Sequence, residues 1–162
     1  MDFLERIYLP RKLFVDLDGT LFNNYHRKHL MPADTNDLES WVEFNNACLG
    51  DKIIMPMLET VQAISSFFMY TEIIVVTARG EKAKEHTCQQ LEKANFAHDK
   101  IIMRPMDFFG SNTSFKKGVF SSMGMDTTSF LFEDDIDIIN MARDSFGCVT
   151  IYSPLNCVSI KK

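Results

Sequence analysis

Short apolar runs alternate along the sequence with segments in which apolar residues recur at helical spacing. Such runs are typical of strands that are buried on both faces of a parallel sheet, and the segments between them are typical of helices that cover such a sheet. We therefore predict an α/β fold built on a doubly wound parallel sheet. The expected strands lie at residues 12–15, 73–76, 101–103, 129–132 and 148–152, and the expected helices at residues 37–48, 56–68, 81–95, 115–123 and 136–145.

The segment between the first strand and the second predicted helix differs from the rest of the chain. Residues 22–55 are mostly polar and irregular, and they are too few for a full cap domain. We expect them to form a small lid-like insert, whose one predicted helix could be capped by Asp34 or Asn36. A length of 162 residues fits one domain, so residues 1–162 are expected to form a single domain that ends its last helix at Gly147.

Composition limits the partners and the compartment that we expect. A net charge of −5 and a pI of about 5.3 argue against broad, non-specific binding to duplex nucleic acid, which needs many Lys and Arg contacts to phosphates. A local basic pocket for one phosphate is still compatible with this balance. The four cysteines lack the spacing of a zinc site, the N-terminus lacks a signal-peptide pattern, and no apolar run could span a membrane. We expect a cytoplasmic protein with reduced thiols and no membrane partner.

Polar residues follow three of the predicted strands at their carboxyl ends, where ligands bind in sheets of this type. They are Asp16 and Asp18 after the first strand, Thr77 and Arg79 after the second, and Asp134 and Asp135 after a later one, with Lys116 on a helix that can reach the same edge. One residue separates Asp16 from Asp18, so their side chains share a face. We expect all of these groups to converge on one cleft.

The carboxylates in this predicted cleft indicate a cation. Four carboxylates at one sheet edge would repel one another unless a cation lay between them. Mg²⁺ prefers oxygen ligands and keeps water and substrate phosphate oxygens in its shell. We therefore expect a Mg²⁺ site in which Asp16 and Asp134 give side-chain ligands and Asp18 gives its backbone carbonyl. Asp135 is expected to be a ligand or to support one.

Four motifs resemble those of a known family. Phe14-Val15-Asp16-Leu17-Asp18-Gly19-Thr20-Leu21 resembles the signature of the haloacid dehalogenase (HAD) superfamily of phosphatases. Val75-Val76-Thr77-Ala78-Arg79 is similar to its second motif, Lys116 to its third, and Phe132-Glu133-Asp134-Asp135 to its fourth. Order and spacing agree from residue 12 to about residue 152. The resemblance implies an HAD-like fold and a magnesium-dependent phosphomonoesterase.

The resemblance also implies a role for each matching residue. Asp16 is the expected nucleophile and forms an aspartyl-phosphate, which divides one difficult displacement into two easier ones. Asp18 protonates the leaving oxygen and then takes a proton from the attacking water. Thr77, with the backbone of the first motif, holds phosphate oxygens, and Lys116 offsets the charge of the transferring group together with the metal. Arg79 is a candidate phosphate contact.

Simpler interpretations of the same residues stay open on the sequence alone. They are a turn for Asp16 and Asp18, a helix cap for Thr77, a surface ion pair for Arg79, a solvated position for either Lys116 or Lys117, and helix N-terminal charges for Asp135 and Asp137. The order and spacing of all four motifs favour the catalytic interpretation for Asp16 and Asp18.

A narrower resemblance indicates the substrate. Met103-Arg104-Pro105 followed by the third motif, and residues 38–48 followed by Asp51, resemble the phosphatase domain of phage-type polynucleotide kinase/3′-phosphatases. This implies a polynucleotide 3′-phosphatase or a nucleotidase, which acts on nucleotides or on 3′-phosphate ends of nucleic acid. Gly110 and Asn112 stand where that pattern usually carries an Arg and an Asp.

Other functions remain compatible with the sequence. One is a phosphatase for small metabolites such as sugar phosphates, another is a phosphoryl transferase, and a third is a non-catalytic binding module with an HAD-like fold. Trp41 or Phe44 of the insert could stack a nucleobase, although their helical spacing favours the core.

Overall fold

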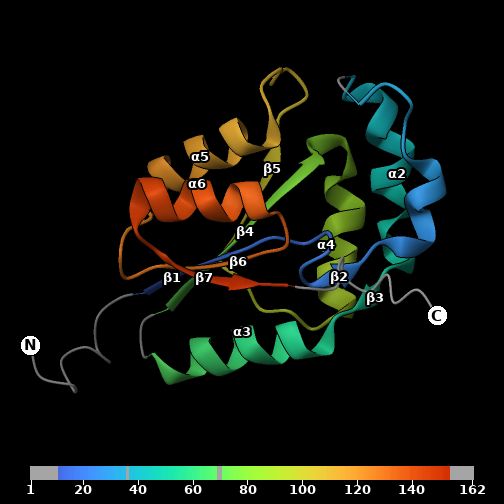
Figure 1. Ribbon diagram of the computed structural model, residues 1–162. Helices are drawn as coiled ribbons and strands as arrows, with labels where there is room; N and C mark the ends of the chain where they lie inside the picture. Colours follow the sequence, from blue (N-terminus) through green and yellow to red (C-terminus); the bar gives the residue numbers. More distant parts are fainter. Residues whose placement is uncertain (1–10, 36, 69–70, 154–162) are drawn as a thin grey trace, which may run out of the picture.

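Five parallel strands form the central sheet of the protein (Figure 1). The computed structural model describes residues 11–35, 37–68 and 71–153, and within these the strand order is β5-β4-β1-β6-β7. Every neighbouring pair is parallel, and β1 lies in the centre between β4 and β6. The predicted doubly wound parallel sheet is confirmed. The strands are β1 (Arg11–Val15), β4 (Thr71–Gly80), β5 (Lys100–Arg104), β6 (Phe130–Glu133) and β7 (Val149–Tyr152).

Helices cover both faces of this sheet, as Figure 1 shows. On one face lie α3 (Met55–Phe67) and α4 (Lys84–Lys93), and on the other lie α5 (Asn112–Ser122) and α6 (Ile136–Phe146). Each pair of helices closes its own apolar core against the sheet. The strands are therefore buried on both sides, which explains why they appear in the sequence as continuous apolar runs.

The central strand β1 supplies side chains to both cores. Leu13 and Val15 belong to the core under α3 and α4, whereas Phe14 belongs to the core under α5 and α6. The Phe14 ring meets the Phe120 ring edge to face, with 5.3 Å between centroids. All three β1 side chains are fully buried, and burial of each stabilises the fold by about 1.5–3 kcal/mol.

Local interactions set the ends of the helices. α6 ends at Gly147, as predicted, because this residue adopts φ 66°, a left-handed conformation that glycine accepts without steric cost. α5 begins before its predicted start at Phe115, because the Ser111 hydroxyl caps it by accepting the N–H of Ser114 (3.1 Å). The helix predicted after β4 begins with a 3₁₀ turn, η4 (Glu81–Ala83), that continues into α4.

The insert after β1 contains a 3₁₀ helix, a two-stranded ribbon and one continuous helical stretch. The 3₁₀ helix is η1 (Tyr25–Leu30), the ribbon is formed by β2 (Phe22–Asn23) and β3 (Lys52–Ile53), and the helical stretch is made of η2 (Glu39–Trp41), α2 (Val42–Asn46) and η3 (Ala47–Gly50). β2 pairs antiparallel with β3, so the two ends of the insert meet next to the sheet. This ribbon has no counterpart in the sequence predictions, because two-residue strands carry no periodic pattern.

The helix predicted over residues 37–48 is confirmed in position, because η2, α2 and η3 follow one another without a break from Glu39 to Gly50, but only its central turn is α-helical and both ends are 3₁₀. Helical turns this short are not stable alone and depend on contacts with the surrounding chain. Here the Trp41 indole donates to the carbonyl of Thr35 (3.1 Å).

At the start of η2 the N–H of Glu39 donates to Asp37 Oδ1 (3.0 Å), so Asp37 supplies the side-chain acceptor there. Asp34 accepts the Ser40 hydroxyl through its carbonyl (2.9 Å). The alternative cap, Asn36, lies outside the described residues.

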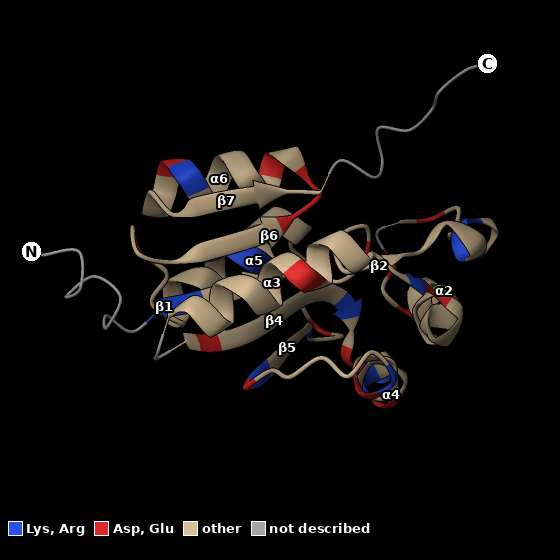
Figure 2. Ribbon diagram, turned by 90° about the horizontal axis from the view of Figure 1, so that it is seen from below, with Lys and Arg blue, Asp and Glu red and all other residues tan. Residues whose placement is uncertain are grey.

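Charged residues lie at the ends of the strands and on the helices, and the middle of each strand carries none (Figure 2). None of the described helices has the length and apolar character needed to cross a lipid bilayer. Cys48, Cys88 and Cys148 are not joined in disulfides within the part of the chain that the structure describes, and Cys157 lies outside it.

Candidate active site

The turn after β1 places the two carboxylates of the first motif. The N–H of Asp16 donates to the carbonyl of Phe132 on β6 (3.0 Å), which fixes the end of β1 against its neighbour. The carbonyl of Leu17 accepts the N–H groups of three following residues (2.9–3.3 Å), and Gly19 adopts φ 89°. The chain therefore reverses directly after Asp18, and both carboxylates remain at the carboxyl edge of the sheet.

A cavity of about 790 Å³ opens at this edge. Its lining includes every residue that the sequence predicts for the site, namely Asp16, Asp18, Thr77, Arg79, Lys116, Asp134 and Asp135. The insert contributes Leu38, Trp41 and Phe44, and the loop after β5 contributes Phe109, whose side chain is 89% exposed. The cavity thus has charged groups at the sheet edge and apolar groups from the insert and from the loop after β5.

The Lys116 ammonium group lies between two buried carboxylates. Its Nζ donates to Asp16 Oδ1 (2.7 Å) and to Glu133 Oε2 (2.6 Å). Burial alone would lower the pKa of Lys116, but the charges of Asp16 and Glu133 outweigh burial and raise it. Lys116 is therefore a constant cation beside Asp16. Lys117 is exposed, so the structure distinguishes between the two candidate lysines.

Three carboxylates are close enough to share one cation. Oxygens of Asp16, Glu133 and Asp134 all lie within 4.8 Å of one another. Burial, and then the charges of neighbouring carboxylates, raise the pKa of Asp16 and of Asp134 to about 7. All of the possible ligand atoms in this group are oxygens, and the ionised carboxylates repel one another because they lie close together. Both properties fit a hard divalent cation such as Mg²⁺.

Asp135 is engaged differently from the other predicted metal ligands. Its Oδ1 accepts the N–H of Asp137 (2.9 Å), which caps α6. Its carboxylate is not one of the three in the close group, although it lines the cavity. Glu133 takes the third place in that group, and its Oε1 also accepts the N–H groups of Asp134 and Asp135 (both 3.2 Å).

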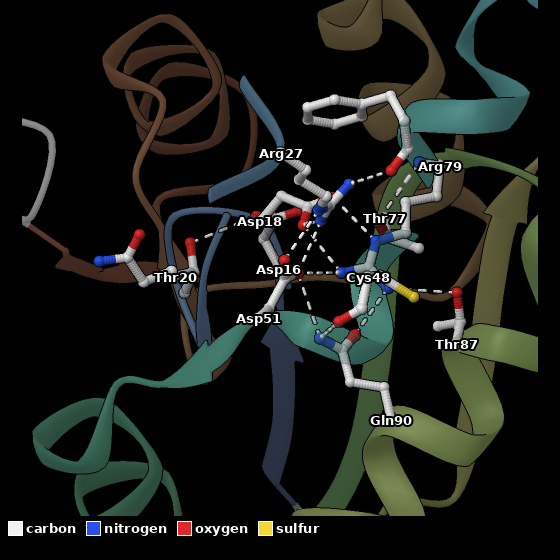
Figure 3. Close-up of polar contacts among 12 residues, drawn as sticks. Asp16, Asp18, Thr20, Arg27, Cys48, Asp51, Thr77, Arg79, Thr87 and Gln90 are labelled. Atoms are coloured by element: carbon white, nitrogen blue, oxygen red, sulfur yellow. Dashed lines mark hydrogen bonds and ion pairs between the residues drawn. The ribbon is translucent and has the colours of Figure 1, made fainter. Parts of the chain in front are cut away.

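Asp18 lies in a second cluster, next to two buried arginines (Figure 3). Arg79 holds it through two bonds, from Nε to Oδ2 and from Nη2 to Oδ1 (both 2.8 Å), and Arg27 Nη2 also donates to Oδ1. Burial alone would raise the pKa of Asp18, but Arg79 and then Arg27 outweigh burial and lower it. The Asp18 carboxylate is therefore ionised in the structure.

The partners of Arg79 leave it little capacity for a direct phosphate contact. Each of its five N–H groups has an acceptor, and the acceptors are Asp18 twice, Asp51, Thr87 and Gln90. Its side chain is fully buried, so it is not part of a surface ion pair either. The sequence suggested a phosphate contact or a surface ion pair for Arg79. The structure instead shows buried contacts with side chains from separate segments of the chain.

Thr77 stands where β4 changes register. The strand continues past its predicted end to Gly80, with an irregularity between Thr77 and Gly80. The Thr77 hydroxyl accepts the N–H of Arg79 (3.3 Å) and lines the cavity while nearly fully buried. This position is compatible with the predicted phosphate contact, since the hydroxyl hydrogen is available for an acceptor.

Sequence reasoning assigned no role to three charged residues of the site. Glu133 stands within the fourth motif, so its position was a usable signal. Arg27 and Asp51 lie 24 residues apart in a segment without clear periodicity, and only the folded insert brings them together (2.7 Å). No pattern in the sequence indicates that contact.

Comparison with known proteins places the chain in a family and gives its fold relatives. The model of the HAD superfamily, subfamily IIIB (acid phosphatase), matches residues 9–127. No curated protein sequence matches the chain. Chains in two solved structures of a Pnkp1/Rnl/Hen1 complex, one of them described as an RNA repair complex, share 20% identity over 89% of this chain, with TM-scores of 0.68 and 0.69.

The chain spans less than half the length of those two proteins, 42% and 46%. A class C acid phosphatase from Bacillus anthracis, solved with tungstate bound, shares 14% identity, with a TM-score of 0.55 over 90% of this chain and 68% of that chain. At these identities the likenesses show a common fold. The family model covers most of the sequence, and the chain therefore belongs to the HAD superfamily, subfamily IIIB (acid phosphatase).

Proposed function

We propose that the protein is a magnesium-dependent phosphomonoesterase that works through an aspartyl-phosphate on Asp16. The observation that carries the proposal is the position of Asp16 in the cavity, with its carboxylate bonded to Lys116 (2.7 Å) and grouped with Glu133 and Asp134. A carboxylate between a fixed cation and a cation site can approach a phosphorus atom whose oxygens those positive charges bind.

The proposed reaction has two steps. In the first, an Asp16 oxygen attacks phosphorus, the bond between phosphorus and the leaving oxygen breaks, and the leaving oxygen takes a proton from Asp18. In the second, water attacks the same phosphorus and gives a proton to Asp18, and the bond from phosphorus to Asp16 breaks. Thr77 and Lys116 bind phosphoryl oxygens throughout. Asp18 is ionised in the structure, which is the form that the second step needs, so it must bind a proton before the first step, and the second step returns a proton to it.

Asp16 and Asp134 would hold the Mg²⁺ by their carboxylates, with Asp18 supplying its backbone carbonyl. When bound, the ion supplies positive charge that offsets the negative charge of the transferring phosphoryl group. Asp135 then acts by capping α6 beside Asp134 rather than as a direct ligand. Glu133 holds Lys116 in place. We assign Arg79 to the support of Asp18 rather than to phosphate.

We further propose nucleotides or 3′-phosphate ends of nucleic acid as substrates. A cavity of about 790 Å³ has the size that encloses a small organic ligand. Trp41 and Phe109 add aromatic surface to its lining, on which a nucleobase can stack. The fold relationship to a chain of the Pnkp1/Rnl/Hen1 complex, which is described as an RNA repair complex, supports the same substrate class. We propose residues 22–55 as a small lid of one domain spanning residues 1–162.

The test is phosphate release with and without Mg²⁺ from a panel of 3′- and 5′-nucleoside monophosphates, a 3′-phosphorylated oligonucleotide and several sugar phosphates. We expect Mg²⁺-dependent release with a preference for the 3′-phosphates. Activity on sugar phosphates alone would keep the mechanism and reject the nucleotide substrate. Asp16→Asn should abolish turnover while it leaves the fold in place. Near wild-type turnover in that variant would overturn the nucleophile assignment.

A further inference from the structure

A buried cluster of four charges connects the insert to the sheet next to the cavity (Figure 3). Its members are Arg27 from η1, Asp51 directly after η3, Arg79 from β4, and Asp18 from the turn after β1. The side chains of both arginines and of Asp51 are fully buried, whereas that of Asp18 is 21% exposed. Asp18 and Arg79 both line the cavity, and Asp18 is the one of the two whose side chain is partly exposed.

Asp51 makes contacts to both arginines. Its Oδ1 accepts from Arg27 Nε (2.8 Å), and its Oδ2 accepts from Arg27 Nη2 (2.7 Å) and Arg79 Nη2 (3.4 Å). Gln90 Nε2 on α4 donates to the same Oδ2 (3.2 Å), and His26 Nε2 contacts Oδ1 (2.8 Å). Asp51 therefore connects the insert, the sheet and α4, although it does not line the cavity itself.

Charge balance makes Asp51 necessary to this arrangement. Two guanidinium groups meet at Asp18, and Asp18 alone supplies one negative charge. The second carboxylate, Asp51, completes the balance, and a buried charge without a partner is unfavourable. The two-bond contact with Arg27 also fixes the plane of that guanidinium, which in turn packs over the Phe44 ring (4.2 Å).

We propose that Asp51 is a positioning residue for the proton transfers of Asp18, an inference that rests on the proposed function of Asp18. Asp51 sets Arg27 and Arg79, and the two arginines hold both oxygens of Asp18 in one orientation toward the leaving oxygen. Asp51 touches neither substrate nor the reacting atoms. Asp51 acts on Asp18 through the two arginines, and it belongs to a part of the insert that has no other role in the proposed mechanism.

Leaving-group chemistry separates this role from a merely structural one. A nitrophenolate leaves without a proton, whereas an alkoxide such as a ribose oxygen needs one in the transition state. A misplaced Asp18 should therefore slow the cleavage of alkyl phosphate esters and leave the cleavage of aryl phosphate esters nearly unchanged. The value of kcat/KM reports only the steps through departure of the leaving group, so the later hydrolysis of the aspartyl-phosphate does not enter it.

The experiment compares kcat/KM for 4-nitrophenyl phosphate with that for a nucleoside 3′-monophosphate. Asp51→Asn keeps the shape of the side chain and removes its charge. We expect its kcat/KM to fall about tenfold or more on the alkyl ester, within the range that general acid catalysis contributes, and less than about threefold on the aryl ester. Glu43→Gln, an exposed carboxylate of α2 in the same insert, should match the wild type on both. If Asp51→Asn does not fold, the charge-balanced pair Arg27→Gln/Asp51→Asn replaces it, with the same expectation.

Asp18→Asn, measured in parallel, distinguishes failure of this inference from failure of the proposed function. It should show the same selective loss on the alkyl ester. If Asp18→Asn loses nothing selectively, the acid role of Asp18 is rejected, and the inference with it. If Asp18→Asn is selective while a folded Asp51 variant loses equally on both esters, or on neither, Asp51 does not position Asp18 and the inference is overturned.

Discussion

The Lys116 ammonium group bridges the carboxylates of Asp16 and Glu133. Its two hydrogen bonds, 2.7 and 2.6 Å long, are buried, so water does not screen them. With Lys116 absent, the group formed by Asp16, Glu133 and Asp134 would keep three acidic side chains without a cation from the protein. Stability and catalysis at this residue are therefore coupled.

Replacing Lys116 by Met should destabilise the metal-free protein by about 3–5 kcal/mol, because a buried charge pair loses one partner. It should also lower kcat/KM by about 100-fold or more, because an oriented positive charge no longer meets the phosphoryl group. Urea unfolding in EDTA and phosphate release in Mg²⁺ measure the two effects. Lys117→Met, at the neighbouring exposed position, is the matched control and should change neither. Equal losses in the two variants would contradict the assignment of Lys116.

Residues at strand ends could be predicted from the sequence, and residues in the insert could not. Asp16, Thr77 and Asp134 follow apolar runs, and parallel strands carry such residues to one edge. The setting of Arg79 depends on Asp51, which belongs to a different segment and reaches it only through the folded insert. The sequence therefore indicated that Arg79 is near the site but not what it contacts.

At the scale of the elements, glycine conformation decides where α6 ends. Gly147 adopts φ 66°, and a Cβ at this position would also lie 3.2 Å from the Thr127 methyl group. The next strand, β7, begins two residues later at Val149, so the reversal must be completed at Gly147. The position demands a left-handed conformation that alanine adopts only with strain.

Gly147→Ala should therefore lower the free energy of unfolding by about 1–2 kcal/mol. It should leave kcat unchanged, because the residue lies outside the cavity lining. The matched control is Gly118→Ala within α5, where an added Cβ meets no atom within 4 Å. That change should stabilise the protein by about 0.5–1 kcal/mol, since alanine favours a helix over glycine. Chemical unfolding measures the free energy of unfolding of both variants. If Gly118→Ala also destabilised the protein, the loss in Gly147→Ala could not be assigned to its left-handed conformation.

The elements themselves differ in how far the sequence determines them. Each predicted strand begins within about two residues of its expected start. A short apolar run between polar residues is typical of a strand that helices cover on both faces, so the run itself marks where the strand lies. The segment at residues 37–48 is helical from Glu39 onward, as predicted, but it is too short to be stable alone, and its ends are 3₁₀ rather than α-helical. Its 3₁₀ turns are set by contacts such as that of Arg27 with the Phe44 carbonyl (3.0 Å), which spacing does not reveal.

At the scale of the whole molecule, proton binding, metal binding and folding are coupled through Asp16 and Asp134. The pKa of each is raised to about 7 in the metal-free fold, against about 3.9 for an aspartate in an unfolded chain. Between these values the folded state binds more protons than the unfolded state, so the contribution of this pair to stability decreases as pH rises to 7 and stays low above it. The two groups interact, and this titration belongs to the pair.

Mg²⁺ requires the deprotonated pair, so it should stabilise the protein more at high pH than at low pH. At a Mg²⁺ concentration of about 100 times its Kd, the gain at pH about 8 is about 2.7 kcal/mol. At pH about 5.5, proton competition should reduce it to less than about 1 kcal/mol. For a chain of this length, thermal unfolding should show a shift in Tm of about 5–10 °C at the higher pH and less than about 4 °C at the lower.

Two variants near the start of α6 test whether the Mg²⁺-induced shift in Tm comes from a cation between Asp16 and Asp134. Asp134→Asn removes one carboxylate of the pair, so it should lose most of the Mg²⁺-induced shift in Tm. Without metal it should exceed the wild type in Tm at pH about 8, because the repulsion with Asp16 is relieved. Asp137→Asn, on the exposed first turn of α6, should behave as the wild type at both pH values. A Mg²⁺-induced shift in wild-type Tm that is equal at the two pH values would mean that the cation binds elsewhere than between Asp16 and Asp134.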